Sequence, residues 1–498
     1  MPPSMHPDTI DPNSTHPDTT HPPTVAIAGG GLAGLAAGCA LAEAGFRVSL
    51  FERRPYLGGR ASSYQHPGTG EIVDNCQHVL LGCCTNLLDF YRRAGVQDKI
   101  RWYEKLTFLE PGGRASVIAP SALPAPLHTA WAFLRADCLS LRDKLAISRA
   151  MAVLAPSVPE DRGASFLDWL QRHGQTGQAI ERFWKTILVS ALNEDLDRIS
   201  VPYAAQVVRE SFLKSAAGGR MGIPTVPLTD LYGTAGDYIR ARGGEIQFRA
   251  SVESFRTVPF AVNVTTNGQE QKFDYLILTV PFDALGRILP DTASAAPLAA
   301  ALGQFSTSPI TGIHLWFDRQ ISGLDHAVLL DRTIQWMFHK SRILEARRNE
   351  SRAHEARNHE ARDNAGGSGS YIELVVSCSR NLVDKSKAEI VEMAMKEAQE
   401  FFPGAPDAIL LKSTVIKEVH ATFSPRPGID PYRPKPETAW PRVFLAGDWT
   451  ATGWPATMEG AVRSGYLAAE AVLRFASGKR ASFLVPDLAP SGFMKLFG

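Results

Sequence analysis

A strand, a glycine-rich turn, a helix and a second strand are predicted in order over residues 24–52, TVAIAGGGLAGLAAGCALAEAGFRVSLFE. Gly29, Gly31 and Gly34 form the pattern G-x-G-x-x-G between the first strand and the helix. The first glycine permits a tight turn, the second lets a pyrophosphate approach the backbone, and the third lets the helix pack close to the strand. This order predicts a Rossmann-like βαβ unit that binds a dinucleotide, within an α/β fold.

The residues after the turn are the next predicted cofactor contacts. Leu32 and Ala33 begin a helix whose free N–H groups and positive dipole end attract phosphate. Glu52 ends the second strand, where a carboxylate can accept both hydroxyls of an adenosine ribose, and Arg53 follows it. These features predict an adenine dinucleotide without separating NAD from FAD.

The stretch ERRPYLGGRASSYQ places Gly58, Gly59 and Arg60 shortly after this acidic residue. Two glycines allow close backbone approach, and an arginine can pair with phosphate. At this point the chain resembles the flavin-dependent amine oxidase and phytoene desaturase superfamily, in which such a loop lies over the pyrophosphate and ribityl region of FAD. The resemblance therefore implies FAD as the cofactor.

A second signature, VFLAGDWTATGWPATMEGAVRSG, lies at residues 443–465. Asp448, after Gly447, is expected to reach a ribityl hydroxyl of the same FAD. Met458 to Ala461 are expected to begin a helix whose N–H groups stabilise negative charge on the reduced flavin. We therefore expect one cofactor site closed by both ends of the chain.

The intervening sequence predicts both more of this domain and a different one. Residues 231–255 read as helix, turn and strand, and the resemblance places the strand around Val252 beside adenine. Residues 126–155 have apolar residues at helical spacing, whereas 314–319, 334–340 and 371–378 read as antiparallel strands. The predicted fold is α/β: a discontinuous Rossmann-like FAD-binding domain with an inserted α+β substrate domain.

The predicted division of the chain follows from this pattern. It comprises a disordered tail (1–23), FAD-binding parts (24–110, 228–295 and 436–477), substrate-domain parts (111–227 and 296–435, the second with a mobile charged insertion at 341–370) and a C-terminal tail (478–498).

Two stretches carry a more specific resemblance: DNCQHVLLGC, from Asp74, and ATFSPRPGIDPYRPKPETAWPRVFLAGDWTATGWPATMEGAVRSG. With HLWFDR they are similar to the squalene-associated FAD-dependent desaturase-like proteins, the hydroxysqualene dehydroxylases of bacterial hopanoid biosynthesis. The resemblance covers residues 24 to about 476, and Cys76 departs from it where that family usually has glycine. It implies FAD-dependent reductive dehydroxylation of hydroxysqualene to squalene, with hydride passing from reduced flavin to an allylic carbon.

Loss of an allylic hydroxyl as water needs a proton donor. Asp74 and His78 are candidates because their loop is expected to face the flavin, and Glu459 is a third, on the helix beside the ring. Each also has a structural interpretation: Asp74 as a turn cap, His78 as a core histidine, and Glu459 as a buried hydrogen-bond partner.

Composition limits the partners. The net charge of +1 gives no reason to expect nucleic acid, and the six cysteines lack CxxC or zinc spacing, so we expect reduced thiols and no metal. A long-chain isoprenoid substrate, an unidentified electron donor and peripheral membrane contact are expected, because such a substrate enters from a bilayer. Residues 126–155 and the tail SFLVPDLAPSGFMKLFG are the candidate membrane contacts, with docking of the tail on the protein's own surface as the alternative. No transmembrane helix is expected, which predicts a cytoplasmic protein at the inner face of the membrane.

Three other functions remain open. An oxidative carotenoid or phytoene-type desaturase would move hydride in the opposite direction on the same fold. An amine oxidase would need an aromatic cage, for which Trp449 and Trp454 are available. A non-catalytic FAD-binding protein is the third, and the intact flavin motifs argue against it.

Overall fold

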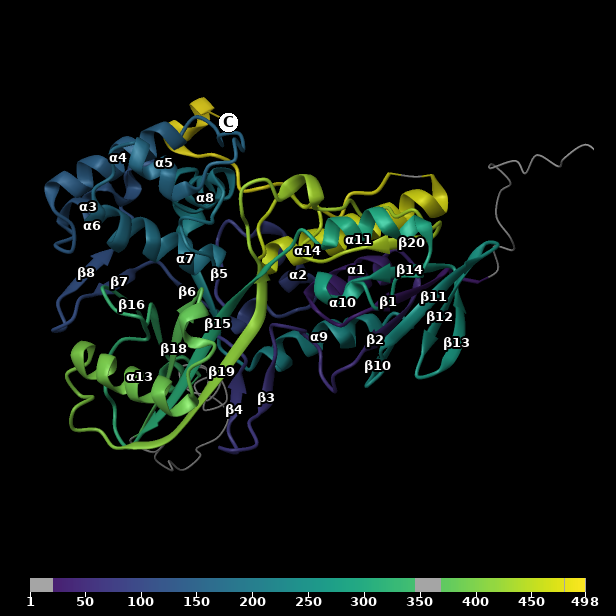
Figure 1. Ribbon diagram of the computed structural model, residues 1–498, viewed down its shortest axis with the longest axis horizontal. Coiled ribbons are helices and arrows are strands. Elements are labelled where there is room, and N and C mark those ends of the chain that lie inside the picture. The colour runs from purple at the N-terminus through teal and green to yellow at the C-terminus, as the bar shows by residue number, and fades with distance from the viewer. Residues whose placement is uncertain (1–20, 345–368, 479, 498) are drawn as a thin grey trace, which may run out of the picture.

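The structure is a computed structural model that describes residues 21–344, 369–478 and 480–497. The predictions for residues 1–20 and for most of the charged insertion lie outside the described residues. In Figure 1 the chain divides visibly into a region around β1, β2 and β14 and a second region around β15, β18 and β19.

Three separated stretches of the chain form one parallel sheet, in the order β10-β2-β1-β14-β20. Its strands are β1 (Thr24–Ala28), β2 (Arg47–Glu52), β10 (Glu245–Phe248), β14 (Tyr275–Leu278) and β20 (Val443–Leu445). Ala28 is in register with Leu278, which is in register with Leu445. The carboxyl ends of β1 and β20 therefore meet at one edge of the sheet, and the Rossmann-like prediction is confirmed.

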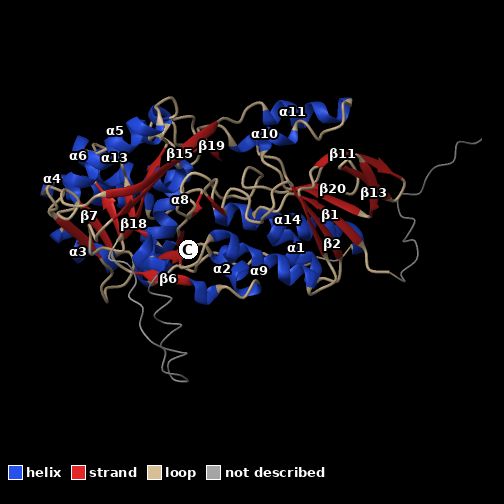
Figure 2. Cartoon of the chain, turned by 90° about the horizontal axis from the view of Figure 1, so that it is seen from below, coloured by secondary structure: helices blue, strands red, loops and turns tan. Residues whose placement is uncertain are grey.

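The two faces of this sheet are covered differently (Figure 2). Val25 and Ile27 pack among residues of α1 (Leu32–Glu43), α9 (Leu228–Arg240) and α14 (Met458–Ser477). The alternate residues Ala26 and Ala28 pack in the cluster that holds the antiparallel sheet β11 (Val252–Val258), β12 (Ala261–Thr266) and β13 (Gln269–Phe273). Strand β1 is thus buried on both sides, which explains its unbroken apolar sequence.

A seven-stranded sheet forms the centre of the second region, in the order β19-β15-β18-β17-β16-β7-β8. Its strands are β7 (Leu106–Leu109), β8 (Ala115–Ile118), β15 (Thr307–Phe317), β16 (His326–Leu329), β17 (Trp336–His339), β18 (Ser370–Ser377) and β19 (Leu410–Phe423). The antiparallel strands predicted around 314–319, 334–340 and 371–378 are confirmed. β7 belongs to this sheet, although it lies within residues 24–110, which the sequence assigns to the FAD-binding domain.

Alternation along the central strands gives this sheet two different faces. Ile313, Leu315 and Leu374 pack with α13 (Lys387–Phe401) in one apolar cluster. His314 and Glu373 alternate with them and are paired across β15 and β18, so both lie on the opposite face. That face carries the polar groups described below.

The helical spacing of apolar residues over 126–155 corresponds to two helices and not to one continuous helix. The structure has α3 (Ala130–Arg135) and α4 (Leu141–Leu154), because Ser140 begins a new helix. The Ser140 side chain accepts from the Asp143 N–H, and the Asp143 carboxylate accepts from the Ser140 N–H. This reciprocal capping box fixes the break between the helices.

The structure has further strands and α-helices outside these two sheets and the helices named so far. They are β3 (Ser63–Gln65), β4 (Ile72–Asp74), β5 (Leu80–Leu81), β6 (Ile100–Tyr103), β9 (Met221–Pro224), α2 (Thr85–Arg93), α5 (Phe166–Arg172), α6 (Gly177–Ala179), α7 (Thr186–Leu192), α8 (Val201–Val208), α10 (Phe282–Leu285) and α11 (Ala296–Leu302). Within the part of the chain that the structure describes, no helix is both long and apolar enough to cross a bilayer.

The packing of α14 on α1 generates the first prediction. A Cβ on Gly465 would lie 2.3 Å from the Ala33 carbonyl oxygen and 2.9 Å from the Ala37 nitrogen. Gly465→Ala should therefore lower the free energy of unfolding by about 1–3 kcal/mol through overpacking, and weaken FAD retention, as measured by denaturant unfolding and bound flavin. Gly233→Ala in α9 is the control, because its Cβ meets no atom within 4 Å, and we expect it to be neutral or stabilising. Equal stability of the two variants would contradict this packing.

Candidate functional site

The glycine-rich turn has the close contacts that its sequence predicts. Gly29 has a φ of +116°, and a Cβ on Gly34 would lie 2.0 Å from the Gly29 carbonyl oxygen. Gly31 is the N-cap of α1, so Leu32 and Ala33 form its first turn. The turn therefore presents free backbone N–H groups at the edge of the parallel sheet.

Glu52 lies beside this turn as predicted. Its Oε2 accepts from the Gly30 N–H at 2.7 Å, and its Oε1 accepts from the Arg54 N–H at 2.8 Å. Arg53 is exposed, whereas Arg54 turns inward and donates from Nη1 to the Gly59 carbonyl at 2.8 Å. Sequence reasoning missed Arg54, although alternation from the inward-facing Glu52 would have favoured it.

The Gly-Gly-Arg loop packs directly on the turn. The Gly58 N–H donates to the Gly30 carbonyl at 2.9 Å, and Gly31 and Gly58 form a parallel bridge. Gly58 has a φ of +105°, and a Cβ there would lie 2.2 Å from the Ala61 carbonyl oxygen. The loop thus needs glycine at this position.

Two motifs that lie far apart in the sequence meet at Arg60 and Asp448. Arg60 Nη2 lies 2.5 Å from Asp448 Oδ1, and its Nη1 donates to the Ala421 carbonyl at 2.8 Å. Gly447, with a φ of +146°, donates its N–H to Ser464 Oγ at 2.8 Å on α14. This contact brings together two motifs that the sequence separates by almost the whole chain.

These groups fit FAD. The close-packed glycines leave room for a pyrophosphate against the backbone, and α1 and α14 begin nearby, α14 at Met458 with Ala461 in its first turn. The Ala250 N–H donates to the Glu52 carbonyl at 3.0 Å, which places the start of β11, at Val252, close to the end of β2, where the sequence predicts the ribose contact.

A buried lysine lies on the polar face of the large sheet. Lys340 Nζ lies 2.7 Å from Asp74 Oδ2, 2.8 Å from Gln77 Oε1 and 3.6 Å from Glu373 Oε2. Burial alone would raise the pKa of Asp74, but the Lys340 ammonium and the Ser63 hydroxyl outweigh it and hold that pKa below its usual value. Asp74 is therefore an ionised carboxylate and a poor proton donor.

Glu373 behaves in the opposite way. Its side chain is 0% exposed, and within the described structure neither carboxylate oxygen has a hydrogen-bond partner. Burial raises its pKa to about 7; the Lys340 ammonium opposes the shift and the Asp74 carboxylate adds to it. Sequence reasoning missed Glu373 and Lys340, since each lies in an ordinary strand context.

The other predicted proton donors are held by structural contacts. His78 Nδ1 lies 2.8 Å from the Cys76 carbonyl, and burial lowers the pKa of His78. Glu459 accepts from the N–H groups of Asn86 and Leu87, at 3.2 and 2.7 Å, and from Arg463 Nε at 2.7 Å. Glu459 thereby caps the N-terminus of α2 and joins it to α14.

Cys76 is accommodated without distortion. Its backbone lies outside the left-handed region that favours glycine. Its side chain packs with Met221, Ile223, Phe338 and Val375. The departure from the usual glycine is therefore a packing change.

An apolar cavity of about 330 Å³ lies beneath α3 and α4. Its lining includes Leu106, Phe133, Ile147, Met151 and Phe183. Leu106, at one wall of the cavity, also packs against the apolar cluster that contains Cys76.

The two candidate tryptophans do not form an exposed cage. Trp449 is buried and donates from Nε1 to the Val280 carbonyl at 3.2 Å. Trp454 is buried beneath the Arg463 guanidinium, which lies 4.6 Å from its ring centroid. Both side chains are therefore part of the core.

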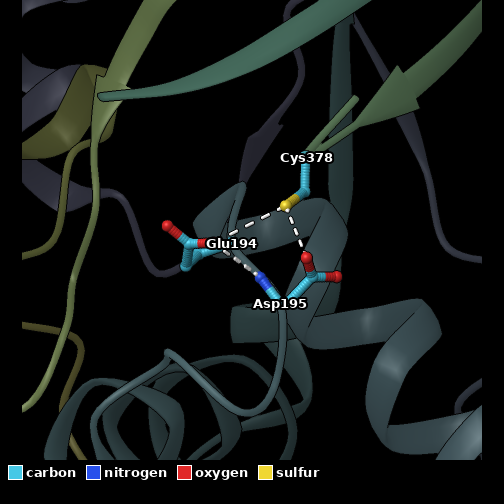
Figure 3. Close-up of side chains that lie close together, drawn as sticks. All are labelled: Glu194, Asp195 and Cys378. Atoms are coloured by element: carbon cyan, nitrogen blue, oxygen red, sulfur yellow. Dashed lines mark hydrogen bonds between the residues drawn. The ribbon is translucent and has the colours of Figure 1, made fainter. Parts of the chain in front are cut away.

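Figure 3 shows Glu194, Asp195 and Cys378 pointing toward one another, with ligand atoms within 4.8 Å. Arg380 Nη1 lies 2.6 Å from Glu194 Oε1 and 2.7 Å from Cys378 Sγ. Burial and the neighbouring carboxylates raise the pKa of the Cys378 thiol to about 12. Metals bind the thiolate form, so we interpret these residues as an ion-pair cluster around Arg380.

Comparison with known proteins identifies the family and the fold. The family model for flavin containing amine oxidoreductases matches residues 32–473. The 15-cis-phytoene desaturase of Synechococcus elongatus is 28% identical over 471 residues, covering 90% of this chain and 95% of the relative. A probable zeta-carotene desaturase from the same organism is 26% identical, covering 90% and 98%. An oxidoreductase from Methanosarcina mazei of known crystal structure has a TM-score of 0.67 at 18% identity, covering 91% of this chain and 99% of its own.

The raised pKa of Glu373 predicts a pH-dependent stability. Between about pH 4.5 and 7 the folded protein keeps a proton that the unfolded chain releases, so this residue reduces stability as pH rises through that window. The unfolding midpoint of Glu373→Gln should therefore rise relative to that of wild type as pH increases from about 4.5 to 7. Above about pH 7 the difference between the two midpoints should stay constant.

Thermal unfolding at several pH values measures this difference. Glu397→Gln is the control, because Glu397 is also buried but accepts from the Thr333 and Ile334 N–H groups at 3.2 and 2.9 Å. A Glu373→Gln difference that does not change with pH would contradict a neutral Glu373.

Proposed function

The chain belongs to the flavin containing amine oxidoreductase family, and we propose that it is an FAD-dependent enzyme that converts hydroxysqualene to squalene by reductive dehydroxylation. FAD in its reduced form supplies a hydride for the allylic carbon. The protein must hold the cofactor, orient an apolar substrate, exclude water and supply a proton to the departing hydroxyl. An electron donor that the structure does not identify must reduce the flavin again.

The observation that carries this proposal is an apolar cavity in the substrate region of a protein that also holds a buried acid on the polar face of its large sheet. The apolar lining, by residues such as Phe133, Ile147 and Met151, suits part of a long isoprenoid chain. The neutral acid Glu373 lies on the polar face, and dehydroxylation needs such a group. A polar amine substrate would gain little from this lining, and the burial of Trp449 and Trp454 also disfavours an amine oxidase.

Oxidative desaturation is the second candidate. The relatives in Synechococcus elongatus are a phytoene desaturase and a probable zeta-carotene desaturase, which favours a long isoprenoid substrate for either reaction. The two functions differ in the direction of hydride transfer and in whether a hydroxyl leaves.

The surface above the cavity supports membrane contact. Leu127, Trp131, Leu134, Leu141 and Leu145 are large apolar residues exposed on and around α3 and α4. Leu127 also lines the cavity. An exposed apolar surface continuous with the cavity would let an insoluble substrate pass from a bilayer into the site.

The C-terminal tail extends this surface. The Phe493 N–H donates to the Ala125 carbonyl at 2.8 Å, and Met494 is buried. Phe493, Leu496 and Phe497 remain exposed beside it. The tail thus docks on the protein and still offers apolar side chains to a membrane, so the two expectations for it are compatible.

An anaerobic reaction tests the direction of hydride transfer. Reduced holoenzyme mixed with hydroxysqualene should yield squalene while the flavin absorbance returns to that of the oxidised form. Oxidised holoenzyme mixed with squalene or phytoene should show no flavin reduction. Flavin reduction by either hydrocarbon, without squalene formation from hydroxysqualene, would replace the proposal with desaturation.

Sedimentation with liposomes tests the membrane surface. Leu134→Glu and Leu141→Glu should each weaken binding about tenfold or more, because each replaces an exposed apolar side chain that would be buried in the lipid on binding. Leu411→Glu is the matched control, since Leu411 is 61% exposed on β19, outside this surface. Equal binding by all three variants, or no binding by wild type, would exclude this surface.

A further inference from the structure

Three buried polar atoms converge on Gly312 of β15. A Cβ on Gly312 would lie 3.5 Å from His314 Nε2, 3.6 Å from the Asn75 carbonyl oxygen and 3.7 Å from Glu373 Oε1. Among the described residues, His314 Nε2 and both Glu373 oxygens have no hydrogen-bond partner, although both side chains are 0% exposed. Buried polar groups in proteins are nearly always paired, so this convergence points to a ligand group at this position.

The elements around this position join the cofactor region to the substrate region. Asn75 follows β4 in the loop that continues to Cys76 and His78, whereas His314 and Glu373 belong to the large sheet. Gly312 has no side chain, so the position that its Cβ would occupy is open to a small group between His314, Glu373 and the Asn75 carbonyl. A hydroxyl oxygen held there would be within reach of a carboxylic acid.

We propose that Glu373 is the proton donor to the leaving hydroxyl, an inference that rests on the proposed function. The Glu373 O–H bond breaks and its proton joins the hydroxyl oxygen of the substrate. The carbon–oxygen bond then breaks, water leaves with the electron pair, and the allylic carbon accepts the hydride of the reduced flavin. The sum is alcohol plus proton plus hydride giving hydrocarbon plus water, so atoms and electrons balance.

The charged neighbours suit both states of Glu373. The Asp74 carboxylate disfavours a second negative charge and keeps Glu373 protonated before the reaction. The Lys340 ammonium, 3.6 Å from Glu373 Oε2, stabilises the carboxylate that remains afterwards. Two more groups face Glu373 and stay neutral: burial lowers the pKa of His314 to about 3, and it raises that of the Cys76 thiol well above its usual value.

The remaining hydrogen bond of His314 fixes its ring. Its Nδ1 lies 2.8 Å from the Tyr371 hydroxyl, and burial raises the pKa of that hydroxyl well above its usual value. Nε2 is therefore left to face Glu373 and the incoming oxygen. His314 acts as a positioning residue for the hydroxyl.

The test compares Glu373→Gln with Glu397→Gln in single-turnover reactions of the reduced holoenzyme with hydroxysqualene. Both variants should retain FAD. Glu373→Gln should slow squalene formation by about 100-fold or more, as expected for loss of a general acid, whereas Glu397→Gln should form squalene at the wild-type rate. The wild-type rate should fall as pH rises through about 7. Gly312→Ala, which the Cβ distances accommodate, should also slow the reaction while leaving stability unchanged.

Infrared spectroscopy gives a readout that does not depend on turnover. Wild type and Glu397→Gln should show the carbonyl stretch of a buried carboxylic acid that disappears as pH rises through about 7, and Glu373→Gln should lack it. Squalene formation by Glu373→Gln at the wild-type rate overturns the role of Glu373 alone. Absence of squalene with wild type overturns the proposed function, whatever the infrared result.

Discussion

The relative position of the two regions depends on the contacts of the buried Lys340 ammonium. Lys340 pairs with Asp74, the last residue of β4, and lies 3.6 Å from Glu373 on β18. Removing one partner of such a buried pair leaves an uncompensated charge, at a cost of about 3–5 kcal/mol. The contact therefore holds the cofactor-side loop in a fixed position against the large sheet, and it also separates the protonation states of two neighbouring carboxyl groups.

That separation follows from position and not from residue type. Asp74 accepts from Lys340 and Ser63, so its charge is compensated. Glu373 lies farther from the same ammonium and accepts no comparable bond, so burial dominates and its pKa rises. Of two carboxyl groups that share one cation, one can thus be ionised while the other is neutral at the same pH. Acid catalysis near neutral pH requires this arrangement.

The sequence predicted the cofactor end of the molecule because its constraints are local. Gly29, Gly34 and Gly58 are required by turns and close contacts within a few residues, and Glu52 ends a strand of the same unit. Arg60 and Asp448 lie close together, as expected for two motifs that each implied the same FAD, but the sequence assigned them to phosphate and to a ribityl hydroxyl and not to each other. Arg54 was missed in favour of Arg53 because the alternation of the strand was not extended two residues beyond Glu52.

The polar face could not be predicted in the same way, because its members come together only through the tertiary fold. Lys340 and Asp74 are separated by 266 positions, and nothing in the local sequence of either marks the contact. Glu373 lies within YIELVVSC, where strand periodicity puts it on one face without saying that this face is covered by the loop from Asp74. The capping box at Ser140 could have been predicted from the sequence, but it was missed because the apolar residues of 126–155 keep a helical spacing on both sides of it.

The cavity and the acid depend on each other physically. In the proposed reaction the apolar lining would exclude water from the substrate, while the burial of Glu373 lowers the local dielectric and strengthens the charge interactions around it. The same desolvation keeps Glu373 protonated, because a carboxylate without a close partner is unfavourable there. A more hydrated cavity would ionise Glu373 and give an allylic cation a competing nucleophile, so the apolar lining serves both substrate binding and the chemistry.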